Sequence, residues 1–305
     1  MMTVLVLGGC GFIGSHLVDA LLRHGVGVRV FDRQAERFRP PVHGVEYRFG
    51  NFSDRMSLVE VMTGVDVVIH LISTTFPGTA DLDPRTDVKD NLIGTINLLD
   101  SMVSLGIKRI VYFSSGGTVY GVPDCVPIPE SHPLRPINSY GIVKAAIENY
   151  LEMYRRTRGI SPLILRPSNP YGPRQGHAGV QGVISTFLRR ALGNEAIEVW
   201  GDGSVVRDFI HVRDLAELCA LAVQSDVEGV FNAGSGIGVS VNDIIQHVKD
   251  VSGQDVRTIY KPGRPVDVQR SVLDSSLAKR VFDWKLQVPL AQGLAENWQW
   301  LKDMG

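Results

Sequence analysis

The 305-residue sequence has little cysteine, no excess of charge and no long hydrophobic run. Its three cysteines are far apart, odd in number and outside any metal-ligand spacing, which favours a reducing compartment over a disulfide framework. The 31 basic and 32 acidic residues give a net charge of -1, so no long-range field attracts nucleic acid. No apolar run reaches the roughly 18 residues of a membrane helix, and the start "MMTVLVLGG" lacks a signal-peptide pattern. We therefore expect a cytoplasmic protein without membrane or nucleic-acid partners.

Short β-branched runs alternate with longer helical patterns through the first half of the chain. The segments between the runs, such as 12–25 and 91–106, have apolar residues at helical spacing and stop at a glycine. This alternation predicts an α/β fold of Rossmann type, a doubly wound parallel sheet with helices on both faces. The expected strands are "TVLVLG", "GVRVFD", "VEYRFG", "DVVIHL", "RIVYFSS" and "SPLILRP".

The pattern loosens after Arg166, where turn-rich stretches separate shorter elements. We interpret this half as a smaller C-terminal cap that binds substrate and whose segments interleave with the sheet. The dinucleotide-binding domain is expected over 1–166 with 204–234 returning to it, and the cap over 167–203 and 235–305. Within these parts we expect helices at 180–193, 213–225, 240–252 and 289–302, and strands near 197–200 and 230–233.

The segment "VLGGCGFIGSHL" carries a glycine pattern between a strand and a helix, with Gly8, Gly11 and Gly14 at three-residue spacing. Such glycines let the backbone turn tightly and approach a pyrophosphate, whose charge is met by N–H groups at the helix N-terminus. A glycine-rich turn without a ligand is the alternative, but the position within a βαβ unit favours cofactor binding. We assign Phe12 and Ile13, which open the helix, to the same site.

Asp32 ends the second expected strand, about 20 residues after the glycines, where a carboxylate accepts hydrogen bonds from an adenosine ribose. This position favours NAD, although Arg33 leaves NADP open because its guanidinium suits a 2′-phosphate. Further cofactor contacts are expected after the third and fourth strands, at Asn51, Phe52 and Leu71.

The stretch "NSYGIVKAAIENYL" sets Tyr140 and Lys144 four residues apart, on one face of a helix. An ammonium near a phenol, together with an oxidised nicotinamide, lowers the pKa of the phenol from its ordinary value of about 10 and lets it act as a base. A surface Tyr–Lys pair is the alternative. A dinucleotide loop in the same chain makes catalysis the favoured interpretation.

Seven motifs together resemble the extended short-chain dehydrogenase/reductases, and among them the nucleotide-sugar epimerases of the UDP-glucose 4-epimerase type. They are "GGCGFIG", "NLIGTINLL", "SSGGTVYG", "SYGIVK", "RPSNPYGP", "VVRDFIHVRDLA" and "GRPVDV". The resemblance implies that Tyr140 takes the proton of the sugar 4-hydroxyl while hydride passes from C4 to NAD. The 4-keto sugar then turns and is reduced on its other face. A UDP-sugar substrate, and a homodimer joined by helices near 84–105 and 140–158, are further implications. Leu92, Ile96 and Leu99 form an apolar stripe at helical spacing that fits such a contact, although a stripe facing the sheet would look the same.

The same resemblance assigns five residues to the nucleotide sugar. Asn169, Arg207 and Arg264 would contact its diphosphate, the arginines because their fork geometry matches phosphate oxygens. Asp267 would hold the nucleotide ribose. Ser271 would lie beside the sugar 2-substituent, where a small side chain leaves room for an N-acetyl group.

The segment "SSGGTVYG" departs from the family, which usually has a serine or threonine where this sequence has Gly116. Ser115 is the first candidate to supply the missing hydroxyl and Thr118 the second; otherwise Tyr140 acts unaided. The loop also offers no carboxylate, which disfavours dehydratase and decarboxylase chemistry. An NADPH-dependent 4-keto-sugar reductase and a non-catalytic nucleotide-binding regulator remain alternatives to the epimerase.

His70 and His211 each follow an apolar run, where a lone histidine is more often structural than functional. Neither has a second ligand at metal spacing. We therefore expect no metal.

Overall fold

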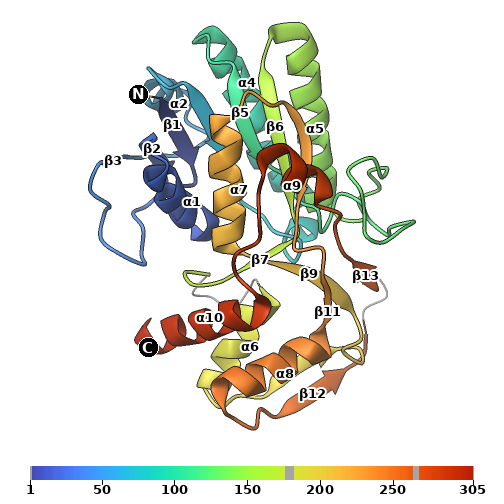
Figure 1. The fold of residues 1–305 in the computed structure, drawn as a ribbon. Coiled ribbons are helices and arrows are strands. Elements are labelled where there is room, and N and C mark those ends of the chain that lie inside the picture. Colours follow the sequence, from blue (N-terminus) through green and yellow to red (C-terminus); the bar gives the residue numbers. More distant parts are fainter. Residues whose placement is uncertain (1, 176–181, 264–267, 305) are drawn as a thin grey trace. The chain divides into compact units, whose positions relative to one another are not determined.

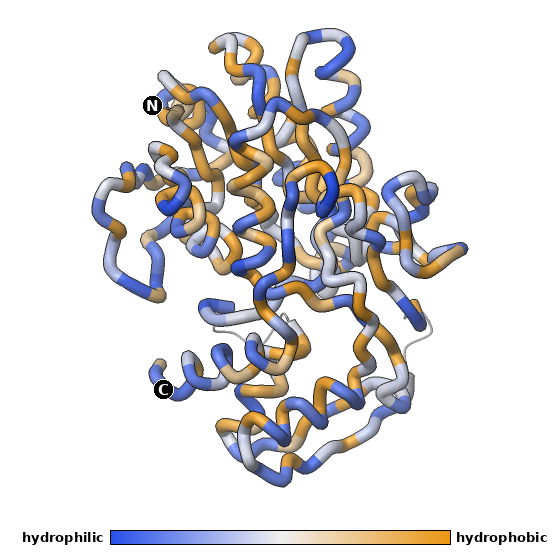
Figure 2. The backbone as a smooth tube through the Cα atoms, in the orientation of Figure 1, coloured by the Kyte–Doolittle hydropathy of each residue, from blue (hydrophilic) through white to orange (hydrophobic). Residues whose placement is uncertain are grey.

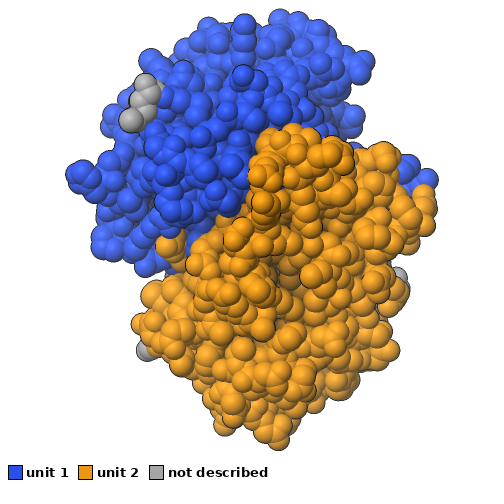
Figure 3. All heavy atoms as spheres, in the orientation of Figure 1, with its two compact units in different colours: residues 1–121, 133–166, 216–231 blue, residues 122–132, 167–215, 232–305 orange. Residues whose placement is uncertain are grey.

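The computed structural model describes residues 2–175, 182–263 and 268–304. The chain divides into two compact units, coloured separately in Figure 3, and each unit is assembled from three segments. Unit 1 comprises Met1–Gly121, Pro133–Arg166 and Ala216–Phe231, and unit 2 comprises Val122–His132, Pro167–Leu215 and Asn232–Gly305. Within the described part of the chain, no helix has both the length and the apolar character needed to cross a membrane.

A seven-stranded sheet forms the centre of unit 1, with the strand order β10-β6-β5-β4-β1-β2-β3. The strands from β6 to β3 pair in parallel, and their order is that of a doubly wound fold, which reverses between β4 and β1. All six strands expected in the first half of the chain are present. The bounds are β1 (Thr3–Leu7), β2 (Gly27–Asp32), β3 (Val45–Phe49), β4 (Val67–His70), β5 (Arg109–Phe113), β6 (Ser161–Pro167) and β10 (Gly229–Ala233).

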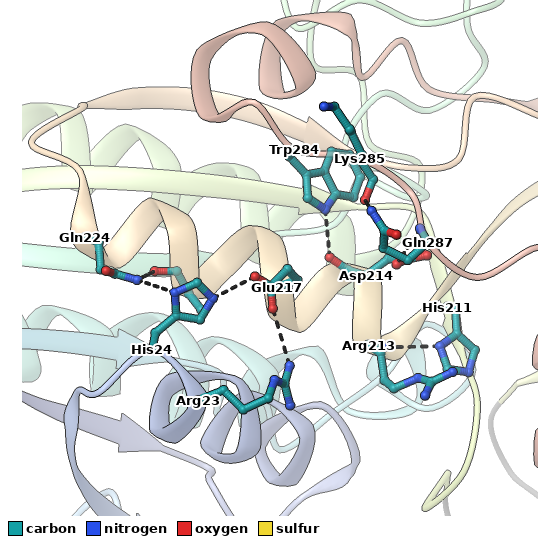
Figure 4. A network of polar contacts seen from close by, with 11 residues as sticks. Arg23, His24, His211, Arg213, Asp214, Glu217, Gln224, Trp284, Lys285 and Gln287 are labelled. Atoms are coloured by element: carbon teal, nitrogen blue, oxygen red, sulfur yellow. Dashed lines mark hydrogen bonds and ion pairs between the residues drawn. The ribbon is translucent and has the colours of Figure 1, made fainter.

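Helices cover both faces of this sheet (Figure 1). On one face α1 (Phe12–Arg23) lies beside α7 (Val212–Gln224), and the His24 ring is hydrogen-bonded to Glu217 of α7 at 2.6 Å (Figure 4). On the other face α4 packs between α2 and α5. The elements there are α2 (Arg55–Met62), η1 (Ala80–Leu82), α3 (Pro84–Asp87), the π-helical turn η2 (Val88–Ile93), α4 (Gly94–Ser104) and α5 (Ser139–Arg158).

The core of unit 1 forms where apolar helix stripes meet the sheet. Leu99 of α4 and Ile147 of α5 are buried there with Leu5 and Leu7 of β1. The inner strands β1, β4, β5 and β6 are buried almost throughout, as expected for a parallel sheet covered on both faces, whereas the edge strand β3 has no buried residue. Apolar residues are orange in Figure 2. The packed core therefore fixes the strand ends that carry the candidate site.

Unit 2 contains two small sheets and a helical layer. The strand β9 (Val206–His211) lies between β11 (Gly238–Ser240) and β13 (Arg270–Ser271) and also pairs with β7 (Asn169–Tyr171), while β8 (Ile197–Trp200) pairs with β12 (Thr258–Lys261). Three helices pack their apolar faces together in the core of this unit. They are α6 (Val183–Leu192), α8 (Val241–Ser252) and α10 (Leu290–Met304), and α9 (Ser276–Phe282) precedes α10.

Asp214, in the first turn of α7, organises the chain that precedes α10 within unit 2. Its carboxylate accepts hydrogen bonds from the backbone N–H groups of Gln287 (2.9 Å) and Val288 (3.2 Å). Its carbonyl oxygen accepts a bond of 2.9 Å from the buried indole of Trp284, as Figure 4 shows. A carboxylate close to the positive end of a helix is favourable, so this contact stabilises both the loop and the start of α7.

Candidate active site

The turn between β1 and α1 brings the three predicted glycines together. Gly8 has a φ of 87°, a left-handed conformation that favours glycine, and its carbonyl oxygen accepts a bond of 3.2 Å from the N–H of Gly11. A Cβ on Gly14 would stand 2.2 Å from the same oxygen. Gly11 is the N-cap and provides no side-chain cap, so the first turn of α1, which Phe12 and Ile13 open, can meet an anion.

Asp32 stands beside this turn because β1 and β2 are neighbours in register. Its carboxylate accepts hydrogen bonds from the N–H of Cys10 (3.0 Å) and from the N–H of Arg33 (2.7 Å). Burial, Asp32 and Glu36 together raise the pKa of the Cys10 thiol to about 12. Asp32 and Glu36 contribute negative charge at this point and Arg39 contributes positive charge, and the Asp32 carboxylate itself suits a ribose diol.

The remaining predicted cofactor residues of unit 1 follow β3 and β4. Asn51 is exposed, and its side-chain oxygen accepts a bond of 3.1 Å from the N–H of Ser53. The ring of Phe52 is buried in the core, 5.1 Å from the ring of His70, so any cofactor contact of Phe52 would come from its backbone. The N–H of Leu71 donates to the carbonyl oxygen of Leu7 at 3.0 Å, which holds Leu71 close to the glycine turn.

Tyr140 and Lys144 lie in the first two turns of α5, as their spacing predicts. Asn138 caps this helix by accepting a bond of 2.8 Å from the N–H of Gly141. Lys144 is 5% exposed, and its ammonium donates to the carbonyl oxygen of Phe113, at the end of β5, at 2.7 Å. The Lys144 Nζ lies 5.6 Å from the centre of the Tyr140 ring. The helix and the strand together therefore fix the ammonium close to the phenol.

The chain alone favours a neutral phenol at Tyr140. Burial raises its pKa to about 12, and the negative charge of Asp87 adds to the rise. Burial lowers the pKa of Lys144 to about 8, against the opposing effects of Glu148 and Asp87. The sequence predicts that the ammonium and an oxidised nicotinamide lower the pKa of the phenol. In the structure burial raises this pKa, so the positive charge of the nicotinamide is needed to bring it down toward neutral pH.

The loop after β5 contains both candidates for the missing hydroxyl. Ser114 is buried and its hydroxyl donates to Glu148, so this hydroxyl is not available to a substrate. Ser115 is partly exposed, and its carbonyl oxygen accepts the N–H of Thr118 at 3.3 Å. The Thr118 hydroxyl is buried, and among the described residues it has no hydrogen-bond partner. A buried hydroxyl without a partner is costly, and a bound ligand would satisfy it.

Three buried charged residues around α5 were not predicted from the sequence. Arg166 of β6 forms an ion pair with Glu148 (Nε–Oε1 3.0 Å) and donates to the hydroxyl of Tyr120 at 2.8 Å. Asp87 is completely buried beside the start of α5. Glu148 follows Lys144 by four residues and so shares its helix face, a spacing that could have revealed it. Nothing in the local sequence around Asp87 distinguishes it from the other acids of its segment.

In unit 2, β9 brings together three of the residues predicted to bind the nucleotide sugar. Asn169 lies opposite Phe209 in the β7–β9 pair, and its amide donates to the carbonyl oxygen of Asp208 at 2.8 Å. Arg207 donates to the carbonyl oxygen of Val268 at 2.6 Å. Ser271 is the direct neighbour of Arg207 in the β13–β9 pair. The predicted residues Arg264 and Asp267 lie outside the described residues.

The two histidines that drew attention in the sequence are buried. The His70 ring is hydrogen-bonded to the hydroxyl of Thr95 at 2.9 Å, and burial lowers its pKa to about 3. His211 accepts the N–H of Arg213 at 3.3 Å (Figure 4), and burial lowers its pKa to about 4. Among residues 2–175, 182–263 and 268–304, no group of three or more His, Cys, Asp and Glu side chains is arranged to hold a metal.

Comparison with known proteins identifies the family. The sequence model of the NAD dependent epimerase/dehydratase family matches residues 4–234, so the chain belongs to this family. NAD is thus the cofactor to be accommodated, and the glycine turn, Asp32 and the Tyr140–Lys144 pair of unit 1 fit it. The fit rests on the close approach at Gly14, where a Cβ would fill the space beside the glycine turn.

Three solved structures are similar over almost the entire chain. The UDP-glucose 4-epimerase of Thermotoga maritima, solved with UDP-glucose, is 34% identical with a TM-score of 0.94, and 99% of each chain is covered. The UDP-glucose 4-epimerase of Thermus thermophilus, in complex with NAD, is 33% identical with a TM-score of 0.91 and the same coverage. A UDP-N-acetylglucosamine 4-epimerase of Methanobrevibacter ruminantium, in complex with UDP-N-acetylmuramic acid, is 29% identical with a TM-score of 0.92 and covers 100% of this chain and 99% of that one.

Proposed function

We propose that the protein is an NAD-dependent nucleotide-sugar 4-epimerase that acts through a transient 4-keto sugar. The observation that carries this proposal is the Tyr140–Lys144 pair on α5, held by the Phe113 carbonyl in the same unit as the glycine turn. Similarity to UDP-sugar epimerases across the whole chain supports a UDP-sugar as the substrate.

The proposed reaction needs one proton acceptor and one group that stabilises its charge. NAD, held by the glycine turn, Asp32 and Lys144, would supply a hydride acceptor at C4 of the sugar and a hydride donor to the opposite face. Tyr140 takes the proton of the 4-hydroxyl and later gives it back, so no proton or electron is gained or lost over the cycle. Lys144 stabilises the phenolate, and its bond to the Phe113 carbonyl keeps the ammonium in place.

Thr118 is the residue that we propose to replace the hydroxyl absent at Gly116. Its hydroxyl is buried and lacks a partner among the described residues, whereas Ser114 is already bonded to Glu148. In the role that the sequence assigned first to Ser115, it would share the proton of the sugar 4-hydroxyl with Tyr140. Ser115, which is partly exposed, remains the second candidate.

The nucleotide-sugar contacts in unit 2 are proposed for Asn169, Arg207 and Ser271, with Arg264 and Asp267 assigned by resemblance alone. The register of β9 supports the proposal, because it places Ser271 beside Arg207 and Asn169 beside Phe209, two residues further along the same strand. A guanidinium can hold a diphosphate bidentately. A small side chain at residue 271 leaves space beside it for an N-acetyl group.

We also propose a homodimer formed by η2, α4 and α5. The stripe that the sequence suggested for this contact lies elsewhere: Leu99 is fully buried and Leu92 packs against the core of unit 1. The exposed large apolar residues lie on η2 (Val88 and Ile93) and on α5 (Ile142, Tyr150 and Met153), and we take them together as the stripe that forms the contact. Covering such a surface by a second copy would remove it from water.

Sedimentation at micromolar concentration tests the dimer. The wild type and Met56→Asp, a control on α2 at a side chain that is 84% exposed, are expected to sediment as dimers. Ile142→Asp, which places a charge in the stripe, is expected to sediment as a monomer. A monomeric wild type would refute the proposal.

The function itself is tested with the purified protein. We expect NAD to be released on denaturation, and UDP-glucose and UDP-N-acetylglucosamine to be converted into their 4-epimers without added cofactor, as separated by chromatography. A protein that arrives without NAD and consumes NADPH with a 4-keto sugar would instead be a reductase. A protein with no turnover on any UDP-sugar of a hexose and N-acetylhexosamine panel would contradict the epimerase.

A further inference from the structure

Asp87, the last residue of α3, is a buried acid at the junction of three segments. It is completely inaccessible to solvent. Its Oδ1 accepts hydrogen bonds from the Thr75 hydroxyl (2.7 Å) and the Asn91 amide (2.8 Å), and its Oδ2 accepts one from the Ser139 hydroxyl (2.7 Å). The Asn91 amide can only donate through its nitrogen, so Asp87 acts there as an acceptor. These bonds join the chain after β4, the π-helical turn and the start of α5.

The bond to Ser139 connects Asp87 with the catalytic helix. Ser139 is the first residue of α5 and directly precedes Tyr140. A second acid, Asp81 of η1, accepts the backbone N–H of Ser139 at 2.7 Å but is exposed to solvent. Both carboxylates stand at the positive end of the helix, which favours them. Only the charge of Asp87 acts without screening by water.

The charged and titratable groups around Tyr140 in unit 1 come from every element that packs there. His70 is held neutral by burial, and the pKa of Tyr112 lies well above its usual value. The negative charge of Asp87 raises the pKa of Tyr140 and the pKa of Lys144, in each case behind the larger effect of burial. Among the described residues, the groups that interact with this part of the site are Asp81 of η1, Asp87 of α3, His70 of β4, Tyr112 of β5, and Lys144 and Glu148 of α5.

We infer that Asp87 is a positioning residue that anchors the first turn of α5 and sets the pH range in which the Tyr140–Lys144 pair works. The inference rests on the proposed epimerase function. The negative charge keeps the Lys144 ammonium protonated although it is buried. The same charge restrains ionisation of Tyr140 until the positive nicotinamide is present. Asp87 thus couples the two groups, because a change of its charge shifts the pKa values of Tyr140 and Lys144 in the same direction.

Asp87→Asn tests this coupling, since it keeps the size and removes the charge. The pH profile of kcat/KM for the UDP-sugar should be bell-shaped, with an acid limb from Tyr140, which must be deprotonated, and an alkaline limb from Lys144, which must be protonated. Without the negative charge both groups lose protons more easily. We expect both limbs to move to lower pH by about 0.5 to 1 unit.

A titration without substrate separates this inference from the proposed function. The ultraviolet absorbance of tyrosinate is followed with pH in the NAD-loaded protein, and the difference between wild type and Tyr140→Phe isolates the curve of Tyr140. The same difference is then taken in the Asp87→Asn background. We expect the midpoint of the Tyr140 titration to lie at lower pH in the Asp87→Asn background than in the wild type, whether or not the protein turns over a UDP-sugar. An unchanged midpoint would overturn the inference and leave the epimerase proposal intact.

Two variants distinguish charge from mechanical anchoring. Ser139→Ala removes the bond to Asp87 but keeps the buried charge, and Asp81→Asn removes an exposed charge from the same turn. Asp81→Asn is expected to lower kcat without moving the limbs. Ser139→Ala is expected to lower kcat and, because it removes one donor from the Asp87 carboxylate, to move both limbs slightly to higher pH, opposite to Asp87→Asn. If they move the limbs as far as Asp87→Asn does, the role of Asp87 is structural only and the inference is wrong.

Thr75→Val keeps the inference testable if Asp87→Asn does not fold. It removes one donor from the Asp87 carboxylate and leaves the negative charge less neutralised. Both limbs should then move to higher pH, opposite to the shift for Asp87→Asn and smaller. Limbs that stay in place would overturn the inference.

Discussion

Gly14 lies so close to the main chain of Gly8 that a Cβ on residue 14 would stand 2.2 Å from the Gly8 carbonyl oxygen. The neighbouring atoms are backbone, including Gly9 Cα at 2.7 Å, and cannot turn away as a side chain could. The close approach brings the start of α1 against the end of β1. The cofactor cradle therefore depends on the absence of a side chain at this position.

Gly14→Ala should yield a protein that purifies with little NAD and melts at a lower temperature, because the turn must open to admit the methyl group. NAD released on denaturation and the thermal midpoint are the two measurements. Gly78→Ala is the matched control, since a Cβ there meets its nearest neighbour, the Phe76 ring, at an ordinary 3.6 Å. Full NAD content in Gly14→Ala would show that the turn tolerates a side chain.

Tyr140→Phe should abolish turnover and leave NAD bound, because it removes the phenolic oxygen and keeps the ring. The conversion of UDP-glucose and the NAD content of the same preparation are compared with those of the wild type. Tyr150→Phe, which changes an exposed tyrosine of the same helix, is the control and should retain turnover. Turnover near the wild-type rate in Tyr140→Phe would remove Tyr140 from the mechanism.

Thr118→Val should slow turnover by roughly 10²–10⁴-fold, the range expected for a partner in proton transfer. The substitution keeps the shape and removes a hydroxyl that has no partner among the described residues, so the fold should not suffer. Ser115→Ala should cost less. The comparison is made on kcat at saturating substrate; a larger loss in Ser115→Ala would restore the order that the sequence suggested.

The sequence predicts more of the fold of unit 1 than of unit 2. Most strands of unit 1, such as β1, β4 and β5, are short β-branched or apolar runs, and each is recognisable by itself. The strand β9 carries Arg207 and Asp208 within the sequence "VRDFIH", and its partners β7, β11 and β13 are two or three residues long. Such strands are defined by contacts between distant segments, which local patterns do not contain. The sequence therefore predicts helices and one strand of unit 2, β8, but not the sheet that carries the substrate residues.

The candidate site shows the same limit. Glycine spacing and the Tyr140–Lys144 spacing are local signals, and the structure places these residues as expected. Helical periodicity identified Leu99 as part of an apolar stripe, but it could not tell a face against the sheet from a face against a second copy, and Leu99 is in the core. Asp87 meets Ser139 only through the fold, so no local pattern could assign it to the catalytic helix.

Glu148→Ala should destabilise the protein by about 3–5 kcal/mol, because it removes the carboxylate that pairs with the buried guanidinium charge of Arg166. Both side chains are only 6% exposed. Glu152→Ala is the control on the same helix: it breaks exposed ion pairs with Arg155 and Arg156, and these contribute little in water. Urea unfolding followed by circular dichroism measures the difference. Equal midpoints for the two variants would show that the buried pair does not stabilise the fold.

Ser271→Tyr should selectively depress activity on UDP-N-acetylglucosamine. Ser271 is 7% exposed and lies beside Arg207 in the β13–β9 pair, so a large ring has to occupy space next to the residue proposed to hold the diphosphate. The wild type is expected to accept both acetylated and plain UDP-hexoses, because an enlarged pocket rejects a smaller ligand only weakly. The measurement is the ratio of kcat/KM for UDP-N-acetylglucosamine to that for UDP-glucose, which should fall at least tenfold, about 1.4 kcal/mol of discrimination.

Ser271→Ala is the control, because it keeps the space open and should leave the ratio unchanged. Retained NAD content and an unaltered thermal midpoint show that Ser271→Tyr is folded. An equal loss on both sugars in a folded Ser271→Tyr would mean that residue 271 does not border the sugar 2-substituent.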